Sequence, residues 1–222
     1  MHRFSEISAV IFDMDGLVLD TETTYFQAWQ KASIIMGYDL SYDFFKSLSG
    51  MHYQNIQAKL LEACGADFDL NAFHSIGGAI WRDKIYEVGI QLKRGVIELL
   101  DYLIEHDIPY GLATNSLRVN ALECLKLGWL SEHFSIIVTR DDVVKGKPDP
   151  EMFLKVSDVL NISIDRCLVL EDSVTGIEAA SLSGALSVYI PSSEHIDPIA
   201  VHKCDFLFKD LLDVISALNY RV

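Results

Sequence analysis

Cationic side chains are scarce in this sequence of 222 residues. It contains 18 Lys and Arg against 32 Asp and Glu, which gives a formal net charge of −14. So acidic a chain is repelled by nucleic-acid phosphates and by anionic bilayers, and we expect neither as a partner. The charge balance does not exclude a small phosphorylated ligand, because a few cations placed at one site can bind a single phosphate.

Cysteines are also few, and long hydrophobic runs are missing. The four cysteines form no C-x-x-C pair, so neither a zinc site nor a disulfide framework is expected. No run reaches the roughly 20 apolar residues that span a bilayer, and the first residues lack the apolar segment of a signal peptide. We find no internal repeat and no Gly/Ser linker. We expect a globular, cytoplasmic protein that works as a monomer.

The first half of the chain carries one short strand signal and then only helical patterns. Residues 7–12 are apolar and rich in β-branched side chains, which is typical of a buried strand. Helical spacing of apolar residues follows, with Thr21 as a candidate N-cap. No further strand signal appears before Gln91. The predicted helices cover residues 21–36, 42–48, 53–64 and 70–88.

From Gly95 onward, predicted helices and strands alternate. The helices cover residues 95–106, 118–127, 150–160, 174–182 and 208–218, and the strands cover 109–114, 135–139, 167–170 and 186–190. Such alternation implies a mostly parallel sheet with helices on both faces. We therefore predict an α/β fold, with a Rossmann-like, doubly wound core made of residues 1–15 and 92–222. Residues 16–91 would form an inserted α-helical domain.

Polar residues follow the predicted strands at the edge where such sheets bind ligands. Asp13 and Asp15 follow the first strand, and residues at i and i+2 of a strand share one face. Two carboxylates at such a short distance repel each other unless a cation or a proton lies between them. Asp-Gly after a strand is also ordinary turn chemistry, so this stretch alone leaves a turn and a site equally plausible. The later strand ends deliver Thr114-Asn115-Ser116, Lys145-Gly146-Lys147 and Glu171-Asp172-Ser173.

These side chains suit phosphoryl transfer. Mg²⁺ is a hard cation that binds carboxylates, waters and substrate phosphates, and Asp13, Asp15 and Asp172, with Glu171 in reserve, could supply such a site. A carboxylate that is ionised at pH 7 can attack phosphorus without a base. A second acid can hold a proton for the leaving oxygen. Lysine and hydroxyl donors would neutralise the phosphoryl oxygens.

Four segments resemble, in order, the motifs of the haloacid dehalogenase-like superfamily: Asp13-Met14-Asp15-Gly16, Thr114-Asn115-Ser116, Gly146-Lys147-Pro148-Asp149-Pro150 and Glu171-Asp172-Ser173. The helical insertion after the first motif resembles the α-helical cap subclass, typified by β-phosphoglucomutase and phosphoglycolate phosphatase-like enzymes. The resemblance implies a magnesium-dependent phosphoric monoester hydrolase. It would act on a small phosphorylated metabolite, such as a sugar phosphate, through an aspartyl-phosphate intermediate.

The resemblance also implies roles for single residues. Asp13 would be the nucleophile and Asp15 the general acid and base, while Thr114 and Lys147 would bind the transferring phosphoryl group. Mg²⁺ would be held by the Asp13 carboxylate, the Asp15 backbone carbonyl and Asp172, with Glu171 left open as a direct ligand. The implied phosphate-pocket residues are Asn115 and Ser116.

Two departures from the family pattern narrow the range of activities that the resemblance implies. Dehalogenases of the superfamily lack the second aspartate, so Asp15 argues against dehalogenation. The related mutases carry a Lys-Gly-x-Ser-Arg loop in the cap, but residues 48–52 here read Leu-Ser-Gly-Met-His. This loop has neither the lysine nor the arginine, which favours hydrolysis over mutase chemistry. Gly50 and His52 are its candidate substrate contacts. A phosphosugar mutase stays the alternative. A non-catalytic phospho-accepting signalling module is disfavoured, because receiver domains are shorter and lack a helical insertion.

Overall fold

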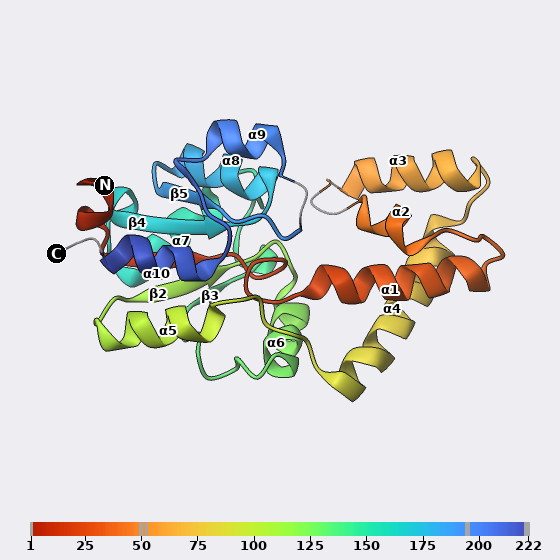
Figure 1. Cartoon of the computed structure of the whole chain (residues 1–222), viewed down its shortest axis with the longest axis horizontal. Helices are drawn as coiled ribbons and strands as arrows, with labels where there is room; N and C mark the ends of the chain where they lie inside the picture. The colour runs from red at the N-terminus through yellow and green to blue at the C-terminus, as the bar shows by residue number, and fades with distance from the viewer. Residues whose placement is uncertain (1, 49–50, 52, 194–195, 220–222) are drawn as a thin grey trace. The chain divides into compact units, whose positions relative to one another are not determined.

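The structure is a computed structural model that describes residues 2–48, 51, 53–193 and 196–219 (Figure 1). The chain divides into two compact units, Met1–Leu19 with Leu92–Val222, and Asp20–Gln91. The insertion thus begins at Asp20, whereas we expected Gly16. Residues 16–19 belong to the first unit because the Leu19 N–H donates to the Met14 carbonyl and the Lys93 N–H donates to the Val18 carbonyl, both at 3.0 Å.

The first unit contains a parallel six-stranded sheet with the order β3-β2-β1-β4-β5-β6. The strands are β1 Ala9–Phe12, β2 Tyr110–Ala113, β3 Ile137–Val138, β4 Cys167–Glu171, β5 Leu186–Tyr189 and β6 Phe206–Leu207. Every residue of β1 and β4 is buried, as their apolar sequences predict. The predicted α/β, doubly wound fold is confirmed.

Helices cover both faces of this sheet. They are α5 Val96–Glu105, α6 Arg118–Leu127, α7 Glu151–Leu160, α8 Val174–Ser183, α9 Pro198–Lys203 and α10 Leu211–Asn219, with short 3₁₀ turns at His2–Glu6, Arg140–Asp142 and Ile164–Arg166. Helices α5 and α10 pack together on the near face in Figure 1, and α7 lies behind the sheet beside α8. Met152, Phe153 and Val156 of α7 are fully buried in the core, and α7 packs against β2, β3 and β1. Burying such a side chain contributes about 1.5–3 kcal/mol, so α7 is firmly held.

The second unit consists of helices in its described part: α1 Thr21–Ile35, α2 Tyr42–Lys46, α3 Tyr53–Cys64 and α4 Leu70–Val88. Its interior is aromatic, with the rings of Phe45 and Phe73 stacked at 6.3 Å between centroids. Helix α1 is capped by Asp20, whose carboxylate accepts from the Thr23 N–H at 3.3 Å, so Thr21 is its first residue rather than its N-cap.

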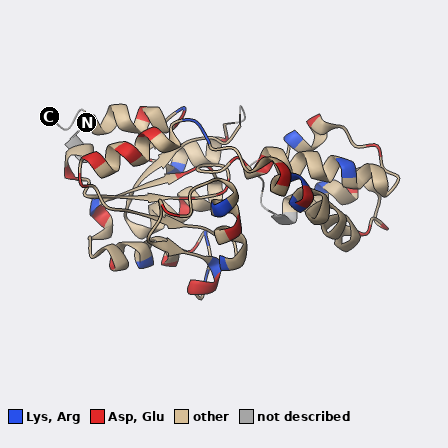
Figure 2. Cartoon of the chain, turned by 90° about the horizontal axis from the view of Figure 1, so that it is seen from below, with Lys and Arg blue, Asp and Glu red and all other residues tan. Residues whose placement is uncertain are grey.

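The described part of the chain has an acidic surface (Figure 2), as the net charge of −14 predicts. Figure 2 shows acidic residues spread over the helices and loops of both units. Within the described part of the chain, no helix has both the length and the apolar character that a bilayer span requires.

Candidate active site

The carboxyl ends of β1, β2 and β4 bring the predicted site residues together. Asp13 directly follows β1, and its N–H donates to the Leu170 carbonyl of β4 at 3.0 Å. Thr114 directly follows β2, and Asp172 follows β4. Because these three strands are parallel neighbours, their ends meet at one edge of the sheet. The site is therefore built from residues far apart in the chain.

Three carboxylates form a buried acidic cluster at this edge. One oxygen each from Asp13, Glu171 and Asp172 lies within 4.8 Å of the others. Carboxylate oxygens are the ligands that Mg²⁺ prefers, and a buried group of them is costly without a cation. The chemistry of this donor set fits a divalent ion. The side chain of Asp15 is not one of the three.

Lys147 places an ammonium group inside the cluster. Its Nζ donates to Asp13 Oδ1 at 2.5 Å, to Glu171 Oε1 at 2.6 Å and to the Ala113 carbonyl at 2.8 Å. An ammonium has three donors, so these contacts use all of them. The ammonium also lies 5.0 Å from the centre of the Phe153 ring. With the Lys147 side chain only 3% exposed, this is a buried ion pair shared between two acids.

The charges in the cluster do not balance without a further cation. Burial raises the pKa of the Asp13 carboxyl to about 8; Lys147 opposes this rise, and Glu171 and Asp15 add to it. Burial by itself would lower the pKa of Lys147, but its attraction to Asp13 and Glu171 outweighs burial and raises it. A folded pKa above the unfolded value means that the metal-free protein loses stability as pH rises from about 4 to about 8. A bound divalent cation would relieve this cost.

Asp15 is held by hydroxyl groups that follow β2. Its Oδ2 accepts from Ser116 Oγ at 2.8 Å and from Thr114 Oγ1 at 3.3 Å. Thr114 Oγ1 in turn accepts from the Ser116 N–H at 3.0 Å. These contacts orient the Asp15 carboxyl separately from the acidic cluster, which suits a group that moves a proton.

Glu171 has little capacity left for a metal ion. Its Oε1 accepts from Lys147, and its Oε2 accepts from the N–H groups of Asp172 and Ser173, both at 3.1 Å, and from Ser173 Oγ at 2.9 Å. A Cβ on Gly176 would lie 1.8 Å from the Glu171 carboxyl carbon, so only glycine fits there. The sequence interpretation missed Gly176, although a glycine in the first turn of a helix is itself a signal.

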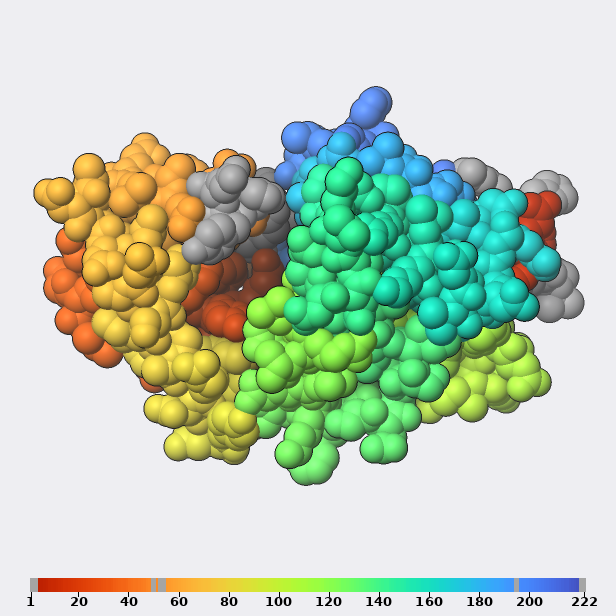
Figure 3. All heavy atoms as spheres, turned by 180° about the vertical axis from the view of Figure 1, so that it is seen from behind, coloured from red at the N-terminus to blue at the C-terminus, as the bar shows by residue number. Residues whose placement is uncertain are grey.

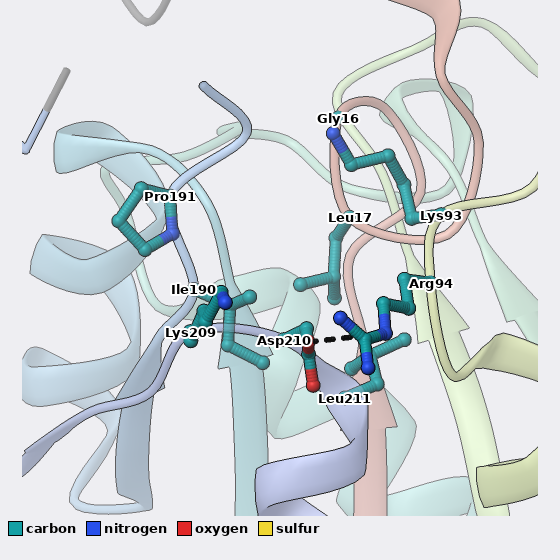
Figure 4. Close-up of a pocket in the computed structure, with 9 residues that line it drawn as sticks. All are labelled: Gly16, Leu17, Lys93, Arg94, Ile190, Pro191, Lys209, Asp210 and Leu211. Carbon is teal, nitrogen blue, oxygen red and sulfur yellow. Dashed lines mark ion pairs between the residues drawn. The ribbon is translucent and has the colours of Figure 1, made fainter. Parts of the chain in front are cut away.

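Gly16 leaves the space that the Asp172 carboxylate occupies. Its φ of +85° is a conformation that favours glycine, and a Cβ there would lie 2.0 Å from Asp172 Oδ2. Gly16 also borders a separate cavity of about 230 Å³ that contains none of the acidic-cluster residues (Figure 4). In that cavity Arg94 pairs with Asp210 at 3.5 Å, and the Lys93 ammonium donates to the Ser192 carbonyl at 2.8 Å.

The remaining predicted residues are placed as follows. Asn115 contacts the backbone of Lys147 through its side-chain amide, with bonds of 2.9 and 3.2 Å. Lys145 lies outside the cluster, exposed, and pairs with Asp149 at 3.6 Å. Gly50 and His52, the candidate substrate contacts of the inserted unit, lie outside the described residues.

Comparison with known proteins identifies the family of this chain. The model of the family "Haloacid dehalogenase-like hydrolase" matches residues 10–190. The phosphorylated carbohydrates phosphatase of Thermotoga maritima is 32% identical over 185 residues, covering 82% of this chain and 84% of that protein. The beta-phosphoglucomutase of Bacillus subtilis is 29% identical over 188 residues, covering 82% of each. The chain belongs to the haloacid dehalogenase-like hydrolase family.

A solved structure extends the likeness to the whole fold. The crystal structure of the HAD hydrolase, family IA, variant 3, from Entamoeba histolytica matches with a TM-score of 0.77 and 29% identity. The match covers 97% of this chain and 99% of that one. The likeness therefore includes both the parallel sheet and the inserted helices.

Proposed function

We propose that this protein is a magnesium-dependent phosphatase that hydrolyses the monoester of a small phosphorylated metabolite, of the sugar phosphate class. The observation that carries the proposal is the buried Asp13, which contacts the Lys147 ammonium and lies within 4.8 Å of two further carboxylates. The name of the Thermotoga maritima relative, a phosphatase of phosphorylated carbohydrates, supports the substrate class.

The carboxylates of Asp13 and Asp172 and the backbone carbonyl of Asp15 would hold Mg²⁺. The ion supplies positive charge that neutralises the phosphoryl oxygens and keeps the Asp13 carboxyl ionised. We assign Glu171 to orienting Lys147 and the turn after β4, because its oxygens already accept four hydrogen bonds. Each acid then has one task.

The reaction would proceed in two displacements at phosphorus. A carboxylate oxygen of Asp13 attacks phosphorus, the bond from phosphorus to the leaving oxygen breaks, and Asp15 donates a proton to that oxygen. Asp15 then takes a proton from water, whose oxygen attacks phosphorus and breaks its bond to Asp13, which releases phosphate. The positive charge of Lys147, whose three N–H donors are already in use, would stabilise the phosphoryl oxygens electrostatically in both steps, and the Thr114 hydroxyl would do so when it donates to them instead of to Asp15.

The inserted unit, Asp20–Gln91, would serve as the cap of the site. A cap of this kind excludes bulk water during the reaction and selects the leaving group. We retain Gly50 and His52 as proposed substrate contacts within it. A monomeric state, a cytoplasmic location and the lack of nucleic-acid or membrane partners remain predictions.

Asp13→Asn tests the mechanism. We expect turnover of p-nitrophenyl phosphate with Mg²⁺ to fall by about 10³-fold or more, because an amide is a poor nucleophile. Asp165→Asn removes the same charge from an exposed aspartate and should leave turnover unchanged. Circular dichroism would check that both variants fold. Retained turnover in a folded Asp13→Asn variant would refute the mechanism.

A phosphosugar mutase is the second candidate, favoured by the likeness to the Bacillus subtilis beta-phosphoglucomutase. Incubation with a hexose 1-phosphate, its bisphosphate and Mg²⁺ separates the two activities. The phosphatase proposal predicts that phosphate release outpaces isomerisation, and the reverse result would favour the mutase.

A further inference from the structure

The lysine of the site is carried by the loop between β3 and α7, which lies outside the sheet. Seen from behind in Figure 3, this part of the chain lies at the surface of the first unit, coloured green. Side chains hold the start of the loop by its backbone. Arg140 donates to the carbonyls of Val143 and Val144 at 2.9 and 3.2 Å, and Glu151 accepts from the N–H groups of Val144 and Lys145 at 2.9 and 2.8 Å.

Asn115, unlike Arg140 and Glu151, contacts the backbone of Lys147 itself. The Lys147 N–H donates to Asn115 Oδ1 at 2.9 Å, and Asn115 Nδ2 donates to the Lys147 carbonyl at 3.2 Å. A Cβ on Gly146 would lie 2.4 Å from Asn115 Oδ1, so the glycine permits this close approach. The side-chain amide thus fixes both peptide groups of Lys147, as a neighbouring strand would.

This pair of bonds matters because the ammonium of Lys147 has to reach three acceptors at once. The acceptors are Asp13, Glu171 and the Ala113 carbonyl, at 2.5–2.8 Å. A lysine side chain has a flexible stem, so the backbone must supply the precision. A misplacement of about 1 Å in a reacting group can cost about 10²-fold in rate.

We propose that Asn115 is a positioning residue, which acts on the reaction by holding the backbone of Lys147 and not by binding the substrate. The inference rests on the proposed phosphatase function. It assigns Asn115 a task beyond the phosphate pocket in which the family resemblance placed it. It also explains why a glycine precedes the lysine in the loop.

The test compares two variants that each lose two hydrogen bonds to the same loop. Asn115→Ala loses the bonds to Lys147, and Glu151→Ala loses those to Val144 and Lys145. With p-nitrophenyl phosphate and saturating Mg²⁺, we expect Asn115→Ala to lower kcat by about 10- to 100-fold with KM within about threefold. Glu151→Ala should keep kcat within about threefold. A raised KM with unchanged kcat in Asn115→Ala would mean a substrate contact and overturn the proposal, as would equal loss of kcat in both variants.

A double variant adds a second check. Gly146→Ala would place a methyl carbon 2.4 Å from Asn115 Oδ1 and 2.9 Å from Arg140 Cδ, and it should also lower kcat. The closer of these contacts is with Asn115 and is removed in Asn115→Ala, so the double variant should be no slower than the worse single variant. Independent, multiplying losses would contradict a shared contact.

A spectroscopic readout separates this inference from the proposed function. In protein labelled with ¹⁵N-lysine, the buried ammonium of Lys147 should give a slowly exchanging signal, assigned by its loss in Lys147→Arg. Asn115→Ala should shift or broaden that signal, and Glu151→Ala should not. If the wild-type protein hydrolyses no phosphate ester, the proposed function fails, and this comparison still decides whether Asn115 positions Lys147. An unchanged signal in Asn115→Ala would refute the inference.

Discussion

Both units bury aromatic rings, but among the described residues only the first unit also buries charged side chains. Among the described residues, the four buried charged side chains all lie at the carboxyl edge of the sheet: Asp13, Lys147, Glu171 and Asp172. In the described part of the second unit, the buried side chains are apolar or aromatic apart from Thr21 and Ser33. The two interiors therefore place different demands on the sequence.

The buried charges serve the chemistry of the site, whereas the apolar interior of the second unit serves packing. Removing an ion from water costs several kcal/mol, so the buried charges of the first unit destabilise it unless each is paired. An aromatic interior asks mainly for apolar side chains of suitable volume, and it tolerates exchange among them. We therefore expect changes at the sheet edge to act first on activity and changes in the second unit to act on stability.

Lys147→Met should have the largest effect, because it breaks the pairing on which the buried acids depend. We expect turnover to fall by about 10³-fold or more and the free energy of unfolding to fall by about 3–5 kcal/mol at pH 8. The stability loss should shrink at pH 5, since burial raises the pKa of the Asp13 carboxyl to about 8 and it can then take up a proton. Urea unfolding at both pH values measures it. A loss that does not depend on pH would show that charge pairing is not the cause.

Phe73→Ala should affect stability alone. The side chain is fully buried against Phe45 and Trp29, and its loss should lower the free energy of unfolding by about 3–5 kcal/mol. At a temperature where the variant remains folded, kcat should stay within a few-fold of the wild type. Tyr86→Ala, at a side chain 63% exposed in the same unit, is the control and should change stability little. A loss of kcat with full stability would contradict the contrast between the two units.

Gly16→Ala should produce a smaller and more specific change. Gly16 and Gly184 have φ values of +85° and +86°, so alanine strains the backbone at both by about 1 kcal/mol. Only at Gly16 would the new methyl group meet Asp172; nothing lies within 4 Å at Gly184. We expect the Mg²⁺ concentration for half-maximal activity to rise by about 10- to 100-fold in Gly16→Ala. A similar rise in Gly184→Ala would show that strain, and not Asp172, is responsible.

The elements that the sequence did not predict are short ones. Strand β6, Phe206–Leu207, has two residues, and the final helix begins at Leu211 rather than at Phe208. Helix α9, Pro198–Lys203, has six residues. Segments of this length carry too few residues for a periodic pattern. Phe206–Leu207 forms a strand because it pairs with β5.

The amino-acid sequence by itself determined the fold class and the set of residues that meet at the sheet edge. Strand and helix periods set the parallel sheet, and parallel strands deliver the residues that follow them to one edge, so Asp13, Thr114 and Asp172 could be grouped without coordinates. Only the tertiary structure decided which atoms touch. That Asn115 holds the backbone of Lys147, 32 residues later, depends on two loops with no periodic pattern, and side-chain contacts between such loops are set by distances of a few ångströms that a linear sequence does not contain.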